Sequence, residues 1–160
     1  MSQKIKIMIL GGARENGKNM YAVQVEDEIF IMDAGLKYPD SSLLGIDVVI
    51  PDLDFFRDYG DKIAGIFLTH GHADSIGALP YILRDYDIPV FGSKLTIELA
   101  KIAVQRENRR RKNDLFHVID ADTEIEFKNA NVSFFKTTHS IPDSLGIDIS
   151  TKEGEIVYTG

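Results

Sequence analysis

A strand, a polar loop and a helix follow one another between residues 63 and 84. Residues 63–68 form an apolar run broken only by one glycine, which is typical of a buried strand. After the loop, apolar side chains recur at helical spacing and predict a helix that ends near Arg84; they are Ile76, Leu79, Ile82 and Leu83. The chain as a whole has predicted strands first, then strand–helix units such as this one, and then strands again. This order indicates mixed sheets covered by helices, in the α/β or α+β class.

The loop between this strand and helix carries His70, His72 and Asp74. A glycine between the two histidines lets the backbone turn so that both imidazoles can face one ion, and the carboxylate adds an oxygen donor. His139 follows another strand-like run and is the candidate for a third imidazole. These ligand types are those of zinc or manganese sites in hydrolytic enzymes, so we predict a metal site at these four residues.

Other interpretations of the same residues stay open. A pair of histidines at this spacing has low specificity, and His139 alone could be a structural or exposed histidine. Asp74 or Ser75 could be the N-cap of the following helix, a role that Asp74 could combine with metal binding. The remaining histidine, His117, lies inside a strand-like run, and we expect it to have a packing or surface role.

The composition limits the class of protein. The chain has 160 residues, 44% of them hydrophobic, which is enough for one domain with a sizeable core. It has no cysteine, so disulfides and thiolate metal sites are excluded and a zinc site must use histidine and carboxylate ligands. No apolar run approaches the roughly 18 residues of a membrane span, and the N-terminus does not resemble a signal peptide, so we expect a cytoplasmic protein.

The charge balance argues against a surface that coats nucleic acid. Eighteen basic and 25 acidic side chains give a net charge of −7. One basic cluster stands out from this acidic background: Arg106, Arg109, Arg110, Arg111 and Lys112. We interpret it as the solvated end of a helix, where cations are favoured. Nucleic acid as a substrate is not excluded, because a local groove and metal ions can hold phosphates.

The rest of the chain is predicted mainly as strands. Residues 20–25 and 29–32 form a predicted hairpin, and residues 36–52 form a long irregular connection over the surface. A short helix is expected at 53–59, and Ser93 is the predicted N-cap of a longer helix that ends in the arginine cluster. The other expected strands are 4–10, 89–92, 116–119, 124–127, 132–137, 147–149 and 156–158.

At these motifs the sequence resembles a known family. Residues 69–80 resemble the metal motif of the metallo-β-lactamase superfamily, whose usual form is His-x-His-x-Asp-His. Further motifs are similar to bacterial ribonuclease J, a metal-dependent ribonuclease family of the β-CASP group, and the resemblance covers essentially the whole chain. These motifs are Leu10-Gly11-Gly12, Glu15-Asn16-Gly17-Lys18-Asn19-Met20, Asp33-Ala34-Gly35, Pro51-Asp52 and His139-Ser140-Ile141-Pro142-Asp143-Ser144.

The resemblance implies a fold, a cofactor and an activity. The fold is an αββα sandwich, of which this chain is expected to be the N-terminal part, and two metals activate a hydroxide that attacks an RNA phosphodiester. By resemblance, His70, His72 and His139 hold one zinc, and Asp74 helps to hold the second and is catalytic; manganese is the alternative metal. The implied activity is that of a 5′ to 3′ exonuclease and endonuclease in mRNA decay and rRNA maturation.

The chain departs from the family pattern in two respects. Ser75 stands where the motif has its last histidine, so the second metal site loses an imidazole donor. The family's metal-bridging aspartate, its further metal-binding histidine, its β-CASP domain and its C-terminal domain have no counterpart in these 160 residues. Ser75, and less strongly residues 13–16, favour the less active second paralogue of the family.

Three functions therefore compete. The first is a ribonuclease with an impaired metal site, acting on RNA and forming a homo-oligomer at the family's full length. The second is a non-catalytic subunit that binds and stabilises an active ribonuclease J paralogue in a hetero-oligomer. The third is a different metallo-hydrolase, such as a thioesterase or lactamase, and the motif that begins at His139 argues against it.

Overall fold

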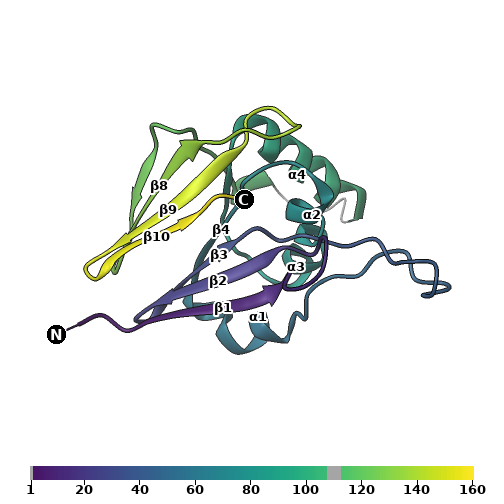
Figure 1. Ribbon diagram of the computed structural model, residues 1–160, viewed down its shortest axis with the longest axis horizontal. Helices are drawn as coiled ribbons and strands as arrows, with labels where there is room; N and C mark the ends of the chain where they lie inside the picture. The colour runs from purple at the N-terminus through teal and green to yellow at the C-terminus, as the bar shows by residue number, and fades with distance from the viewer. Residues whose placement is uncertain (1, 108–112) are drawn as a thin grey trace.

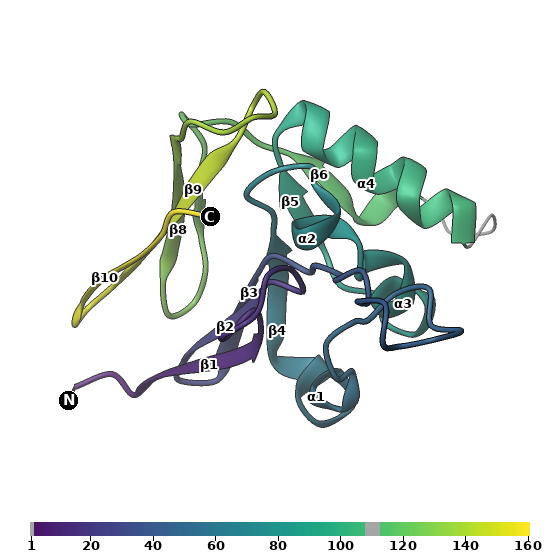
Figure 2. The same cartoon turned by 45° about the vertical axis from the view of Figure 1, so that its right-hand side comes forward.

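Two β-sheets pack face to face, and the helices cover the outer face of the larger sheet (Figure 1, Figure 2). The computed structural model describes residues 2–107 and 113–160. The six-stranded sheet has the order β1-β2-β3-β4-β5-β6, and the four-stranded sheet has the order β10-β9-β8-β7. The described residues thus provide one helical layer and both sheet layers of the expected αββα sandwich.

The first half of the larger sheet is antiparallel. It consists of β1 (Ile5–Gly11), β2 (Met20–Val25) and β3 (Glu28–Met32). The predicted hairpin between β2 and β3 is present, and Glu26 in its turn has a positive φ of 55°. The buried faces of β2 and β3 explain why their sequences are almost wholly apolar.

The second half of the sheet is parallel and carries the helices. β4 (Ile63–Phe67) pairs with β3, and β5 (Val90–Gly92) and β6 (Phe116–Val118) follow in order. The connections contain α1 (Asp54–Tyr59), η1 (Gly60–Lys62), α2 (Ala73–Ile76), α3 (Leu79–Asp85), α4 (Lys94–Glu107) and η2 (Asn113–Leu115). The carboxyl ends of these parallel strands lie at one edge of the sheet, where sites in α/β folds usually form.

The smaller sheet is antiparallel and closes the core on the other side. Its strands are β7 (Glu124–Glu126), β8 (Asn131–Lys136), β9 (Leu145–Thr151) and β10 (Gly154–Tyr158). Phe30 and Phe67 of the first sheet pack with Val132, Phe134 and Ile147 of the second in one buried cluster. The layer between the sheets is therefore buried and apolar, and it fixes the position of the loops at its rim.

The predicted helix from Ile76 to Arg84 is wrong in one respect, because the structure has two short helices there. α2 ends at Ile76, and the Ala78 N–H donates to the Ala34 carbonyl, at 2.8 Å, instead of to its own helix. Pro80, near the start of α3, lacks an N–H and suits a new first turn. Asp74 therefore lies in the first turn of a helix, not in an open loop.

The surface elements mostly follow the sequence pattern. The connection 36–52 is irregular except for a bridge between Lys37 and Val49, and it exposes Leu44. α4 begins directly after Ser93, whose hydroxyl donates to the Thr96 hydroxyl at 2.9 Å. Arg106 lies in the last turn of α4, whereas Arg109, Arg110, Arg111 and Lys112 lie outside the described residues. No helix in the described part is long and apolar enough to cross a membrane.

Candidate metal centre

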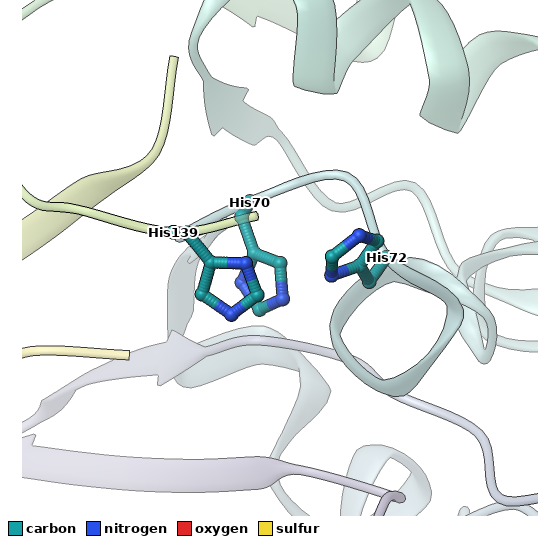
Figure 3. Close-up of side chains that lie close together, drawn as sticks. All are labelled: His70, His72 and His139. Atoms are coloured by element: carbon teal, nitrogen blue, oxygen red, sulfur yellow. The ribbon is translucent and has the colours of Figure 1, made fainter. Parts of the chain in front are cut away.

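Three histidines from different parts of the chain converge at the rim between the sheets (Figure 3). His70 and His72 follow β4, and His139 lies on the connection between β8 and β9. One ring nitrogen of each lies within 4.8 Å of the others, and the His70 and His139 ring centroids are 4.1 Å apart. The structure therefore brings together the three histidines that the sequence singled out.

His70 is the buried member of this group and is oriented through one ring nitrogen. Its Nδ1 lies 2.9 Å from the Thr69 hydroxyl and 3.3 Å from the Ser75 hydroxyl. Its Nε2 is buried without a hydrogen-bond partner. Burial, and then the neighbouring His139, lower the pKa of His70 and favour the neutral imidazole. A neutral imidazole with one nitrogen fixed and the other free is the arrangement that metal-binding histidines adopt.

The buried carboxylate of Asp33 supports the orientation of His70 through Thr69. Asp33 accepts hydrogen bonds from the Thr69 N–H at 2.8 Å, the Thr69 hydroxyl at 2.9 Å and the Tyr158 hydroxyl at 3.1 Å. Burial nevertheless raises the pKa of Asp33 to about 7, because loss of solvent outweighs these three donors. The Thr69 hydroxyl can donate to Asp33 and accept from His70 Nδ1–H, so the carboxylate indirectly fixes the tautomer of His70.

The sequence predictions gave Asp33, Thr69 and Tyr158 no role of this kind. Asp33 follows β3 directly, and β3 pairs with β4, which ends just before Thr69. Two polar residues at the carboxyl ends of adjacent parallel strands are a signal that could have predicted this pair. Tyr158 comes from β10 in the other sheet, and no local pattern relates it to Asp33.

Asp74 lies beside the histidine group, outside the set of three that converges. Its side chain is 38% exposed, and its Oδ1 lies 3.6 Å from His70 Nε2. Its Oδ2 accepts a hydrogen bond from Asn19 Nδ2 at 3.1 Å. A carboxylate at this place could act as a further metal ligand or exchange a proton with a molecule bound beside the histidines.

The other two predicted features of the loop have clear outcomes. The N-cap of α2 is His72, so the interpretation of Asp74 or Ser75 as that N-cap is wrong. Ser75 is fully buried, and its hydroxyl contacts His70 Nδ1, on the side away from the unpartnered Nε2. His117 is exposed and stacks on Phe91 with ring centroids 5.0 Å apart, as expected for a surface histidine.

A cleft opens over the site. Its volume is about 350 Å³, and the residues that line it come from both sheets: Asn19, Tyr21, His70, Asp74, His139, Tyr158, Thr159 and Gly160. The Tyr21 and Tyr158 rings lie 5.4 Å apart at its wall. The donors fit a metal ion, because a buried, unpartnered imidazole nitrogen faces two further imidazoles next to a carboxylate.

Two ribonucleases show what this chain is similar to in sequence. Ribonuclease J 2 of Streptococcus pyogenes serotype M3 is 60% identical over 156 residues, and ribonuclease J 2 of Staphylococcus aureus is 52% identical over 159 residues. These matches cover 98% and 99% of this chain but 28% of the length of each relative. The chain thus spans little more than a quarter of the ribonucleases that it matches.

Solved structures with low sequence identity share the fold. The metallo-β-lactamase fold protein YhfI from Bacillus subtilis matches with a TM-score of 0.64 at 19% identity, over 98% of this chain and 61% of that one. Human tRNase Z, short form, matches with a TM-score of 0.60 at 18% identity, over 98% of this chain and 68% of that one. The sequence profile of the metallo-β-lactamase superfamily matches residues 13–160. By sequence profile, fold and histidine geometry, this chain belongs to the metallo-β-lactamase superfamily.

Proposed function

We propose that this chain forms part of a metal-dependent ribonuclease that hydrolyses RNA phosphodiesters. The observation that carries the proposal is the convergence of His70, His72 and His139 around a buried, unpartnered His70 Nε2. The similarity to ribonuclease J 2 proteins supports RNA as the substrate. We assign zinc to the three histidines because imidazole suits zinc, and we keep manganese as the alternative because the Asp74 carboxylate beside them is a ligand type that suits manganese.

Each side chain of the site has a role in this proposal. The chemistry that such a metal supplies is Lewis-acid activation of water and of a phosphoryl oxygen. Thr69 and Asp33 hold His70 with Nε2 free, and His139 closes the site from the second sheet. Asp74 presents Oδ1 beside His70, where it can accept a proton or help to bind a second metal, and we propose it as the catalytic carboxylate.

The test of the metal centre compares two histidine substitutions. We expect this 160-residue chain to bind at most one zinc, weakly, and His139→Ala to abolish that binding because it removes one of three converging nitrogens. His117→Ala is the matched control, because His117 lies outside the group, and it should leave zinc content unchanged. Zinc content is measured by mass spectrometry after equilibrium dialysis. Equal zinc in both variants would contradict the proposed metal centre, and two equivalents of bound zinc in the wild type would contradict the expectation of at most one zinc.

Ser75 favours a second candidate function, that of a non-catalytic subunit that binds and stabilises an active paralogue. Its hydroxyl is committed to the Nδ1 side of His70, and serine is a far poorer zinc ligand than the histidine of the usual motif. If the serine is what disables a second site, Ser75→His in a protein of the relatives' full length should raise both metal content and RNA cleavage strongly. Unchanged metal content and cleavage in a folded variant would exclude that explanation.

The finer assignments extend the same proposal. By similarity to the ribonuclease J family we propose 5′ to 3′ exonuclease and endonuclease activity in mRNA decay and rRNA maturation, in the cytoplasm. We also propose a homo-oligomer, and a hetero-oligomer with an active paralogue, at the relatives' full length. A 5′-labelled RNA separates the activities: single nucleotides released from the 5′ end indicate the exonuclease, and longer labelled fragments indicate the endonuclease.

A further inference from the structure

One side chain from the connection between β1 and β2 reaches the candidate metal centre. Asn19 lines the cleft together with His70, Asp74 and His139, although it is 51 residues or more from each of them in sequence. It makes a hydrogen bond through its amide to the Asp74 carboxylate, at 3.1 Å from Nδ2 to Oδ2. Among the described residues, Asn19 is therefore the side-chain hydrogen-bond donor to the Asp74 carboxylate.

The backbone holds Asn19 in place independently of this contact. Its N–H donates to the Asp74 carbonyl at 3.1 Å, and its own carbonyl accepts from the Gly35 N–H at 2.9 Å. Gly35 must be glycine for this approach, because a Cβ there would lie 1.6 Å from the Asp74 carbonyl oxygen. These backbone contacts thus hold the Asn19 side-chain amide next to the Asp74 carboxylate.

The hydrogen bond from Asn19 uses one oxygen of the Asp74 carboxylate and leaves the other oxygen available for a second contact. While Oδ2 accepts from Asn19, Oδ1 lies 3.6 Å from the unpartnered His70 Nε2. Without the amide donor, the Asp74 side chain, which is 38% exposed, could rotate toward solvent. We propose that Asn19 is a positioning residue that holds Asp74 with Oδ1 toward His70, an inference that rests on the proposed metal centre with Asp74 as a further ligand of its zinc.

The chemistry of an amide suits this role. Its NH₂ group donates without adding charge beside a carboxylate, whereas an acidic side chain at position 19 would repel Asp74. On the other side of the amide, a Cβ at Gly12 would lie 2.8 Å from Asn19 Oδ1, so the glycine leaves the space that the amide occupies. Since Gly12 also has a φ of +87°, two independent features favour glycine at this position.

A double-mutant cycle tests the inference through metal affinity. Zinc affinity of this chain is measured by competition with a chromogenic chelator for the wild type, Asn19→Ala, Asp74→Ala and the double variant. Asn19→Ala keeps the backbone hydrogen bonds and removes only the amide, and we expect it to weaken zinc binding about 10- to 100-fold, as outer-shell partners of metal ligands do. In the Asp74→Ala background the same substitution should have no further effect.

The control is an asparagine that makes the same kind of contact elsewhere. Asn131 Nδ2 donates to Glu124 at 3.2 Å on the second sheet, so Asn131→Ala removes an amide–carboxylate bond and should leave zinc affinity unchanged. The midpoint of urea unfolding without metal is measured for every variant, and Asn19→Ser replaces Asn19→Ala if the alanine variant does not fold. A role in stability alone would shift the midpoint and leave the affinity of the folded protein unchanged.

The outcomes separate the inference from the proposed function. Wild-type affinity in Asn19→Ala, or an equal loss in both backgrounds, would overturn the positioning role while the metal centre stands. Equal zinc affinity of the wild type and Asp74→Ala would also overturn it, because Asn19 would then have no ligand to position. A wild-type chain that binds no zinc through His139 would overturn the metal centre itself, and the inference with it.

Discussion

At the scale of single residues, Asp33 is the most unusual group of the site. It is buried and accepts hydrogen bonds from the N–H and the hydroxyl of Thr69 and from the Tyr158 hydroxyl, yet its pKa is raised to about 7. The unfolded chain would ionise this carboxyl near its ordinary pKa of 3.8. Between these two pH values the folded protein binds a proton that the unfolded chain has released.

This difference predicts how metal-free stability depends on pH. Below the unfolded value Asp33 contributes fully to stability, and its contribution is lost as the pH rises from about 4 to about 7, by up to roughly 1.4 kcal/mol per unit. Asp33→Asn, which does not titrate, should remove this contribution. The measurement is the urea midpoint in EDTA at several pH values, taken as wild type minus variant. A difference that grows with rising pH would contradict the prediction.

The histidines show how much of a site local sequence reveals at single residues. His70 and His72 could be assigned from their spacing after a buried strand, because both signals are local. His139 could be assigned from its place after a strand and from the family resemblance. Asn19 and Tyr158 could not, because their contacts with Asp74 and Asp33 form only when distant parts of the chain pack together.

At the scale of elements, the first turn of α2 is tied to two distant loops. The Asp74 and Ser75 carbonyls accept backbone hydrogen bonds from Asn19 and Ala34 respectively, so the start of α2, next to His70 and His72, is held by the connections after β1 and β3. Gly35 packs against the backbone of Asp74 and Asn19, which leaves no room for a side chain at position 35. The local sequence predicted a continuous helix here because periodicity does not report such long-range backbone contacts.

Gly35→Ala tests this close approach. The added Cβ would lie 1.6 Å from the Asp74 carbonyl oxygen, so the loops must separate, and we expect a loss of about 1–3 kcal/mol or more in unfolding free energy. Zinc affinity should fall as well, because Asp74 moves with its backbone. Gly60→Ala is the control: its φ is −52° and its nearest neighbour is 3.7 Å away, so stability should change little. Similar urea midpoints for the two variants would show that the close approach of Gly35 to Asp74 does not contribute to stability.

At the scale of the whole molecule, the candidate metal centre belongs to both sheets. His70 and His72 follow a strand of the larger sheet, whereas His139 lies between two strands of the smaller one. The Leu145 N–H donates to the Thr69 carbonyl at 2.8 Å, which joins the two layers beside the site. Metal binding should therefore be coupled to packing between the sheets.

A core substitution outside the histidine group tests this coupling. Ile147→Ala removes a fully buried side chain between the sheets and should cost about 2–5 kcal/mol in unfolding free energy. It should also weaken zinc binding, because His139 is held less firmly against His70. Val157→Ala, at an exposed position on β10, should affect neither quantity. Stability is followed by thermal unfolding with and without zinc, and wild-type zinc affinity in Ile147→Ala would show that the layers are not coupled.

The strands could be predicted because apolar runs are a strong local signal. Their division between two sheets could not be predicted. All strands expected from the sequence are present within a few residues of their predicted bounds. Their division into two sheets, with β6 at the edge of one and β7 at the edge of the other, depends on packing between segments far apart in the chain. That division is what brings His139 to the other two histidines.

The paired tyrosines at the wall of the cleft make the site visible to spectroscopy. The chain contains no tryptophan, so tyrosine dominates its near-ultraviolet absorbance and fluorescence. Tyr21 and Tyr158 are in contact over the cleft, and Tyr158 also donates to the buried Asp33. Burial raises the pKa of Tyr158, so this phenol stays protonated at alkaline pH where exposed tyrosines ionise. A molecule or ion that enters the cleft changes the surroundings of this pair, and the protein thus carries its own optical signal of occupancy.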